Sequence, residues 1–357
     1  MSSGHIRPLK ELRRSDAAAF GGKSANLGEL LSAGIPVPPG FAVSAGAFGD
    51  FVAATGLGGA IERAMARAAS GTVEDGAAAS KAIGEAMRFA PLPEAVRDEL
   101  EERYRELARE TGTPEPAVAV RSSALGEDGE EATFAGQQES FLWVRGLEHV
   151  CDAVRDCWAS LYTPRAISYR AARGAGGEEP AMGVTVQAMV DAEVSGVLFT
   201  CNPVSGDPSM VAIEASWGLG IAVVGGETTP DDFLVSKVTG EVVRRTVNAK
   251  EVEYVPDAAG RGTVRVEVPD ERRTEACLHE EHLTALVDLA RRVERHYGSH
   301  QDVEWALARG RRLPAALAVL QARPVTAVSE RAPKLSGSAL SLVLSTFGAP
   351  SPKDERG

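Results

Sequence analysis

The spacing of apolar residues predicts a helix-rich first third of the chain. Between residues 23 and 33, leucines recur at helical spacing, and Gly34 and Pro36 end the predicted helix. A second amphipathic helix is predicted over residues 93–111, where apolar side chains step by three or four. Gly112 and Pro114 then mark a boundary. Residues 1–112 are therefore expected to form a helix-rich N-terminal subdomain.

The remainder of the chain mixes strand and helix patterns. Alternating or continuous apolar runs predict strands over 117–123, 141–144, 182–190 and 194–200, with the last two expected to pair as a hairpin. Single helices are predicted over 147–172 and 277–297, followed by strands over 303–307 and 317–322. The last thirty or so residues are rich in Ser, Pro and Gly, and a disordered tail is expected from residue 328 to 357.

Composition excludes several classes of protein. The chain has 357 residues, 44% of them hydrophobic and 25% charged, which is the balance of a soluble globular protein with two or three subdomains. A formal net charge of −12 argues against a general nucleic-acid binder. No apolar run reaches the length of about 18 residues that a membrane span needs, and the start lacks the apolar core of a signal peptide. No membrane association is expected.

The cysteines do not follow the spacing of a metal site or a disulfide framework. They are Cys151, Cys157, Cys201 and Cys277. Scattered buried thiols of this kind are typical of a reducing compartment, so a cytoplasmic protein is expected.

Gly21-Gly22-Lys23-Ser24 is the first candidate for phosphate chemistry. Ala17 stands where a P-loop needs its first glycine, so the motif is not a P-loop. Two glycines still allow close backbone approach, and Lys23 opens a predicted helix whose amides and dipole favour an anion. The alternative is a plain helix N-terminus with a solvated lysine.

Residues 118–140 form the second candidate. The predicted strand places Arg121 at its end, and a guanidinium in that position can bind a phosphate with two hydrogen bonds. A Gly-Gln-Gln turn beginning at Gly136 follows an acidic loop and precedes Ser140. Such a turn can surround phosphates with amides and hydroxyls. By composition alone the segment is better described as a polar loop.

The third candidate lies on two predicted strands near residue 310. Period-two alternation places Asp302 and Glu304 on one face of the first strand, and Gln321 and Arg323 on one face of the second. If the strands pair, Glu304, Gln321 and Arg323 converge. Carboxylate and amide oxygens suit Mg²⁺, and the guanidinium suits a triphosphate. A structural salt bridge would use the same residues.

Taken together, these segments resemble a known family. The matching stretches are residues 21–30, 35–41, 119–124, 134–142, 186–190, 217–220, 301–306 and 320–326. In this order they are similar to the N-terminal ATP-binding domain of the phosphoenolpyruvate synthase and pyruvate phosphate dikinase family, also labelled the PEP/pyruvate-binding domain. The ATP-binding parts of rifampicin phosphotransferase and phenylphosphate synthase are similar too.

The resemblance implies an α+β fold of the ATP-grasp type, with the nucleotide between two lobes and a helix-rich N-terminal segment. The first lobe would span 113–190, and the second would span 191–327 and contain the Mg-binding hairpin. The residues it implies for ATP binding are Lys23, Arg121, Gly136, Ser140, Gln187, Met189, Val190, Glu304, Gln321 and Arg323. Arg121 and Arg323 would be catalytic, Glu304 and Gln321 would bind Mg²⁺, and Gln187 with the backbone of 189–190 would bind adenine.

Two features modify this expectation. The family usually has glutamate where Ile221 follows Trp-Gly-Leu-Gly, and none of the six histidines sits in a Thr-Ser-His-like phosphohistidine motif. We therefore expect an ATP-dependent phosphotransferase that passes the β-phosphate of ATP to a histidine on a separate partner, releasing AMP and phosphate. The alternatives are the excised ATP-binding domain of a one-chain dikinase, a non-catalytic ATP-binding regulatory module, and a kinase acting on a small molecule.

Overall fold

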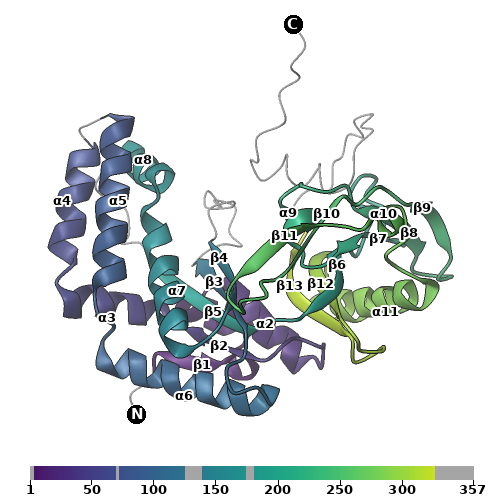
Figure 1. The fold of residues 1–357 in the computed structure, drawn as a ribbon, viewed down its shortest axis with the longest axis horizontal. Coiled ribbons are helices and arrows are strands. Elements are labelled where there is room, and N and C mark those ends of the chain that lie inside the picture. The colour runs from purple at the N-terminus through teal and green to yellow at the C-terminus, as the bar shows by residue number, and fades with distance from the viewer. Residues whose placement is uncertain (1–3, 70–71, 125–138, 174–180, 326–357) are drawn as a thin grey trace, which may run out of the picture. The chain divides into compact units, whose positions relative to one another are not determined.

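Two compact units make up the computed structural model. The structure describes residues 4–69, 72–124, 139–173 and 181–325, so the tail expected over 328–357 lies outside the described residues (Figure 1). Unit 1 comprises residues 1–29 and 39–189, and unit 2 comprises residues 30–38 and 190–357. Both units contain helices and strands, which agrees with the expected α+β class. Among the described helices, none combines the length and the apolarity needed to cross a membrane.

Unit 1 is built on a five-stranded antiparallel sheet of order β1-β2-β5-β3-β4. Its strands are β1 (Ile6–Pro8), β2 (Gly40–Val43), β3 (Val118–Ala124), β4 (Ser140–Val144) and β5 (Met182–Ala188). Its helices are α1 (Ala17–Phe20), α2 (Gly22–Ser32, which continues into unit 2), α3 (Ala45–Thr55), α4 (Gly58–Ala69), α5 (Val73–Phe89), α6 (Glu94–Thr111), α7 (Leu147–Ala159) and α8 (Pro164–Arg173).

The two faces of this sheet are covered by different helices. Val120 of β3 and Val184 and Val186 of β5 belong to the large hydrophobic core that includes α7. Because side chains alternate along a strand, the odd-numbered residues of β3 and β5 face the other way. The first turn of α2 lies on that second face, where Ser24 Oγ is 2.6 Å from Thr185 Oγ1. On the core side, α4, α5 and α8 pack together as a helical group (Figure 1).

Two sequence predictions for unit 1 are wrong. The single helix expected over 147–172 is two helices, because Pro164 lacks the N–H that would continue the first one and instead starts α8. The strand at 182–190 does not pair with the strand at 194–200. It pairs with β2 and β3 in the centre of the unit 1 sheet, where every residue of β5 is buried.

Unit 2 contains a six-stranded antiparallel sheet of order β13-β12-β6-β7-β8-β9 and a separate β10–β11 hairpin. The sheet strands are β6 (Ala192–Phe199), β7 (Met210–Trp217), β8 (Asp231–Ser236), β9 (Val242–Thr246), β12 (Gln301–Ala308) and β13 (Leu317–Pro324). The hairpin strands are β10 (Val252–Pro256) and β11 (Thr263–Glu267), and the helices are α9 (Ile221–Val224), α10 (Asp270–Arg273) and α11 (Glu280–Tyr297). Helix α11 packs along β6 and β12 (Figure 1).

A fully buried ion pair ties three segments of unit 2 together. Lys250 Nζ lies 2.6 Å from Asp231 Oδ1, and both side chains have no exposed surface. The Asp231 carboxylate also accepts hydrogen bonds from the backbone N–H groups of Asn248 and Cys277. The backbone N–H of Cys277 is bonded to Asp231 of β8 and lies outside the helix. Helix α11 therefore begins at Glu280, three residues later than the predicted helix.

Candidate functional site

Lys23 lies at the N-terminus of α2 and is held against strand β3 of unit 1. Its Nζ donates a 3.3 Å hydrogen bond to the Ser122 carbonyl, and the residue is only 9% exposed. The next residue, Ser24, donates its backbone N–H to Ser123 Oγ at 3.3 Å. The solvated-lysine interpretation is therefore wrong, and the Lys23 ammonium belongs to the β3 surface.

Arg121 and Ser140 meet on the face of the unit 1 sheet that carries α2. Arg121 is the direct cross-strand partner of Ser140 on β4 and of Thr185 on β5. Directly paired residues share a face, so the guanidinium stands in a row with two hydroxyl side chains. The sequence-predicted phosphate residues of unit 1 are thus brought together, whereas Gly136 lies outside the described residues.

Gln187 lies on the same face, one row further along the strands. It pairs with Ala119 on β3 and with Gly40 on β2, and it is 2% exposed. The backbone N–H of Met189 donates a 2.8 Å hydrogen bond to the Ala117 carbonyl. This N–H is already used within the fold, so it is not the donor that would bind adenine. Val190, the next residue, is assigned to unit 2.

In unit 2, the two predicted strands form the expected hairpin. Glu304 is the direct partner of Gln321, and Asp302 is the direct partner of Arg323. A register shift follows Glu304, so that Trp305 pairs with Val319 and the extra residue is accommodated beyond the polar pairs. The expected convergence of Glu304, Gln321 and Arg323 on one face is present.

Asp302 is a functional candidate that the sequence analysis placed on this face but assigned no role. Arg323 Nε donates a 2.8 Å hydrogen bond to Asp302 Oδ2, so the structural ion pair of Arg323 is made with Asp302. Burial raises the pKa of Asp302, and the neighbouring guanidinium opposes that rise. This hydrogen bond restrains the orientation of the Arg323 guanidinium group.

Glu214 is a third acidic residue of this face, and the sequence analysis missed it. Val197 pairs with Glu304 on one side and with Glu214 on the other, so all three residues share a row across β12, β6 and β7. The Glu214 side chain is fully buried. A single carboxylate inside the apolar strand Val211–Ala215 was the available signal, because buried acids are rare without a specific partner.

The side chains suit a magnesium ion that is held partly by a substrate. Within the described ranges, no group of three or more His, Cys, Asp or Glu side chains converges as a metal cage. The paired Glu304 and Gln321 supply one carboxylate and one amide oxygen. Mg²⁺ commonly takes one or two protein oxygens and completes its shell with phosphates and water, so this donor set fits it.

Comparison with known proteins decides the family. Residues 17–339 match the domain described as "Pyruvate phosphate dikinase, AMP/ATP-binding domain". The chain belongs to this family. Family membership confirms the resemblance drawn from the sequence motifs, and the domain that matches is described as AMP/ATP-binding.

Several similar proteins are phosphoenolpyruvate synthases. A probable phosphoenolpyruvate synthase of Methanothermobacter thermautotrophicus is 40% identical over 97% of this chain and 49% of its own length. Another from Methanocaldococcus jannaschii is 40% identical over 90% of this chain and 27% of its length. The phosphoenolpyruvate synthase of Pyrococcus furiosus is 37% identical over 92% of this chain and 44% of its length. The chain therefore spans about half or less of the length of these relatives.

Proposed function

We propose that this chain is the Mg-ATP-binding phosphotransferase unit of a dikinase and has an ATP-grasp fold. In the net reaction, ATP, water and a histidine give AMP, inorganic phosphate and a phosphohistidine. The α–β and β–γ linkages break, the histidine nitrogen bonds to the β-phosphorus, and the water oxygen bonds to the γ-phosphorus, which leaves as inorganic phosphate. The histidine that receives the β-phosphate is on a separate partner. The observation that carries the proposal is the direct pairing of Glu304 with Gln321, beside Arg323 held by Asp302.

The residues of unit 1 would bind the nucleotide. The Lys23 ammonium, next to the Ser122 carbonyl, and the Arg121 guanidinium, in a row with Ser140, are suited to phosphate oxygens. Gln187 lies one row away and would bind the base through its amide. Positive charge that is fixed before the substrate arrives is the main requirement of phosphoryl transfer.

The residues of unit 2 have the chemistry needed at the transferring groups of ATP. Glu304 and Gln321 would hold Mg²⁺, which offsets phosphate charge when it is bound. Arg323 would stabilise the charge that develops on the transferring phosphate, and Asp302 keeps its guanidinium in place. Ile221 begins helix α9, where the family usually has glutamate, and this favours an ATP-binding module without turnover as the second candidate.

Four histidines take part in local contacts within the described structure. His5 lies 3.1 Å from Asp50, and His300 lies 2.9 Å from Glu294 on α11. The His279 and His282 rings lie next to each other at the start of α11, with centroids 5.6 Å apart and planes tilted by 35°. These contacts support a phosphate acceptor other than these four histidines.

The test uses ATP labelled at the β or the γ position, with Mg²⁺ and a protein that carries a phosphohistidine motif. Acid-labile β-label on that protein, together with AMP, is the expected result. Label from the γ position with ADP as product would contradict the proposal and indicate an ordinary kinase. ATP binding without any transfer would favour the non-catalytic module.

Site variants connect this reaction to the structure. Glu304→Gln is expected to reduce AMP formation by at least about 100-fold, because it removes a charged oxygen beside Gln321 without changing side-chain size. Glu241→Gln makes the same change at an exposed position of unit 2 and serves as the matched control. AMP formation at wild-type rates in Glu304→Gln would exclude this hairpin from the chemistry.

A further inference from the structure

Trp143 has an unusual backbone conformation for so large a side chain. Among the non-glycine residues that the structure describes, Trp143 alone has a positive φ, and its value is 59°. A bulky residue rarely adopts this left-handed conformation, because its Cβ crowds the following carbonyl. Strained residues of this type cluster at ligand sites, where the surrounding structure holds them in place.

A bulge in strand β4 turns Trp143 away from the hydrophobic core. Val118 pairs with Val144, whereas Val120 pairs with Phe141, so Leu142 and Trp143 together oppose the single residue Ala119. Phe141 and Val144 both pack against the core that contains α7. The residues between them therefore face the other side of the sheet. Trp143 is 6% exposed and does not belong to that core cluster.

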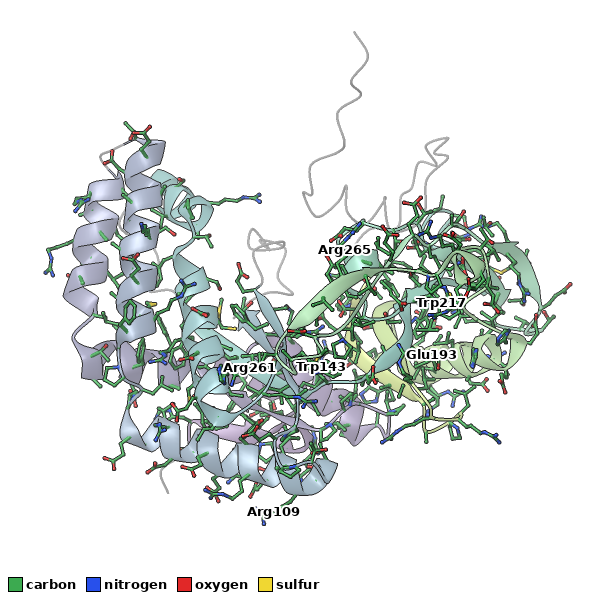
Figure 2. All side chains as sticks on the ribbon, viewed as in Figure 1. Arg109, Trp143, Glu193, Trp217, Arg261 and Arg265 are labelled. Carbon is green, nitrogen blue, oxygen red and sulfur yellow. The ribbon has the colours of Figure 1, made fainter. Side chains whose placement is uncertain are left out.

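The bulge places Trp143 in the same row as Gln187. Trp143 on β4, Ala119 on β3 and Gln187 on β5 lie side by side across the sheet, and Trp143 is labelled in Figure 2. Neighbouring strands lie about 4.8 Å apart, and Ala119, the direct partner of Gln187, lies on the strand between those of Trp143 and Gln187. The row therefore combines a buried aromatic ring with a buried hydrogen-bonding amide.

The next row on this face has the opposite chemistry. It contains Ser140, Arg121 and Thr185, and it lies two residues along β3, or about 7 Å, from the row of Trp143. One row thus contains an aromatic ring and an amide, and the next row contains a guanidinium group and two hydroxyl groups. A nucleotide has the same division, because its base offers a flat π surface and its phosphates offer negative charge.

We propose that Trp143 binds the adenine base of ATP by stacking, beside the Gln187 amide, and that the strained bulge in β4 serves to aim the indole at the base. The proposal deepens the proposed function, since it names the base-binding surface of the same ATP site. It does not depend on which phosphate is transferred or on the acceptor. A tryptophan whose role was to fill the core would instead lie on the face of Phe141 and Val144.

The experiment measures the binding of adenosine, ATP and inorganic tripolyphosphate to the full chain by calorimetry. Trp143→Asn removes the ring but tolerates the positive φ, and Trp143→Phe keeps an aromatic ring. We expect Trp143→Asn to bind ATP and adenosine roughly tenfold more weakly, because loss of one aromatic–base stack has about this effect. Tripolyphosphate affinity should stay within about twofold, and Trp143→Phe should bind ATP nearly as well as the wild type.

Phe89→Asn is the matched control, because it removes an aromatic ring of unit 1 that is 86% exposed at the end of α5. Its ATP affinity should equal that of the wild type. Equal losses of ATP and tripolyphosphate affinity in Trp143→Asn would show a merely structural role and overturn the proposal. Unchanged ATP affinity would overturn it as well.

Fluorescence gives a second test that does not depend on the folding of Trp143→Asn. Adenosine should change the tryptophan emission of the wild type and of Trp217→Phe, in which the replaced ring belongs to unit 2 (Figure 2). The same addition should leave the emission of Trp143→Phe unchanged, and a persisting change would overturn the proposal. If base stacking is observed but no phosphate is transferred, only the proposed function fails.

Discussion

Replacing Gly21 with alanine is expected to destabilise the protein and to displace Lys23. Gly21 has φ 80° and ψ 159°, a region that is almost exclusive to glycine and costs other residues about 1–3 kcal/mol. A Cβ at this position would lie 2.2 Å from both the carbonyl oxygen and the Oγ of Ser123. Relief of such a contact by backbone movement adds about 1–3 kcal/mol. The total expected loss is therefore about 2–6 kcal/mol.

Gly34→Ala is the control for this substitution. Gly34 follows the other end of α2 with φ 67°, and no described atom lies within 4 Å of the position its Cβ would take. Alanine there has only the cost of the left-handed backbone, about 1–2 kcal/mol. Urea denaturation measures both free energies of unfolding, and calorimetry at low temperature measures ATP affinity. Equal destabilisation by the two variants, or unchanged ATP affinity in Gly21→Ala, would refute the close contact between Gly21 and β3.

Two further predictions concern buried groups. Lys250→Met should lower the free energy of unfolding by about 3–5 kcal/mol, because it leaves the buried Asp231 carboxylate without its cation. The double variant Asp231→Asn/Lys250→Met should recover part of this loss in urea denaturation. A loss below about 1 kcal/mol in Lys250→Met would contradict this expectation. Burial raises the pKa of Cys151 to about 11 and also raises the pKa values of the other three buried cysteines. At pH 8 a thiol reagent should therefore react slowly with the native protein and rapidly with four thiols in urea, whereas rapid labelling of the native state would be inconsistent with this burial. Since ionisation is disfavoured only in the folded state, stability should also fall as the pH rises above the ordinary thiol pKa.

The polar hairpin of unit 2 was predictable because its signal is local. Period-two alternation over 302–307 and 317–322 places the polar side chains on one face, and a short connection makes the two strands neighbours. The partner of Arg323 was not predictable. The choice between Asp302 and Glu304 depends on the register, because a shift of two residues would have placed Arg323 opposite Glu304.

Other features depend on contacts that no local pattern encodes. The apolar runs at 182–190 and 194–200 look like consecutive strands of one hairpin, yet β5 and β6 belong to different sheets. An apolar run reports burial but does not identify the neighbour that buries it. Likewise, the segment 141–144 is uniformly apolar, so its sequence does not predict the bulge that turns Trp143 away from the core. The burial of Lys23 follows from tertiary packing against Ser122, not from its helix.

The strand order of unit 1 has a consequence for synthesis on the ribosome. Strands β2 and β3 are separated in the sheet by β5, although both precede it in the chain by more than fifty residues. Until Ala188 has left the exit tunnel, the edges of β2 and β3 that β5 will occupy have no strand between them. Open edges of this kind attract other chains. Nascent chains that stall before Ala188 emerges are therefore expected to require chaperones. In longer nascent chains, β5 can insert between β2 and β3 and complete the sheet.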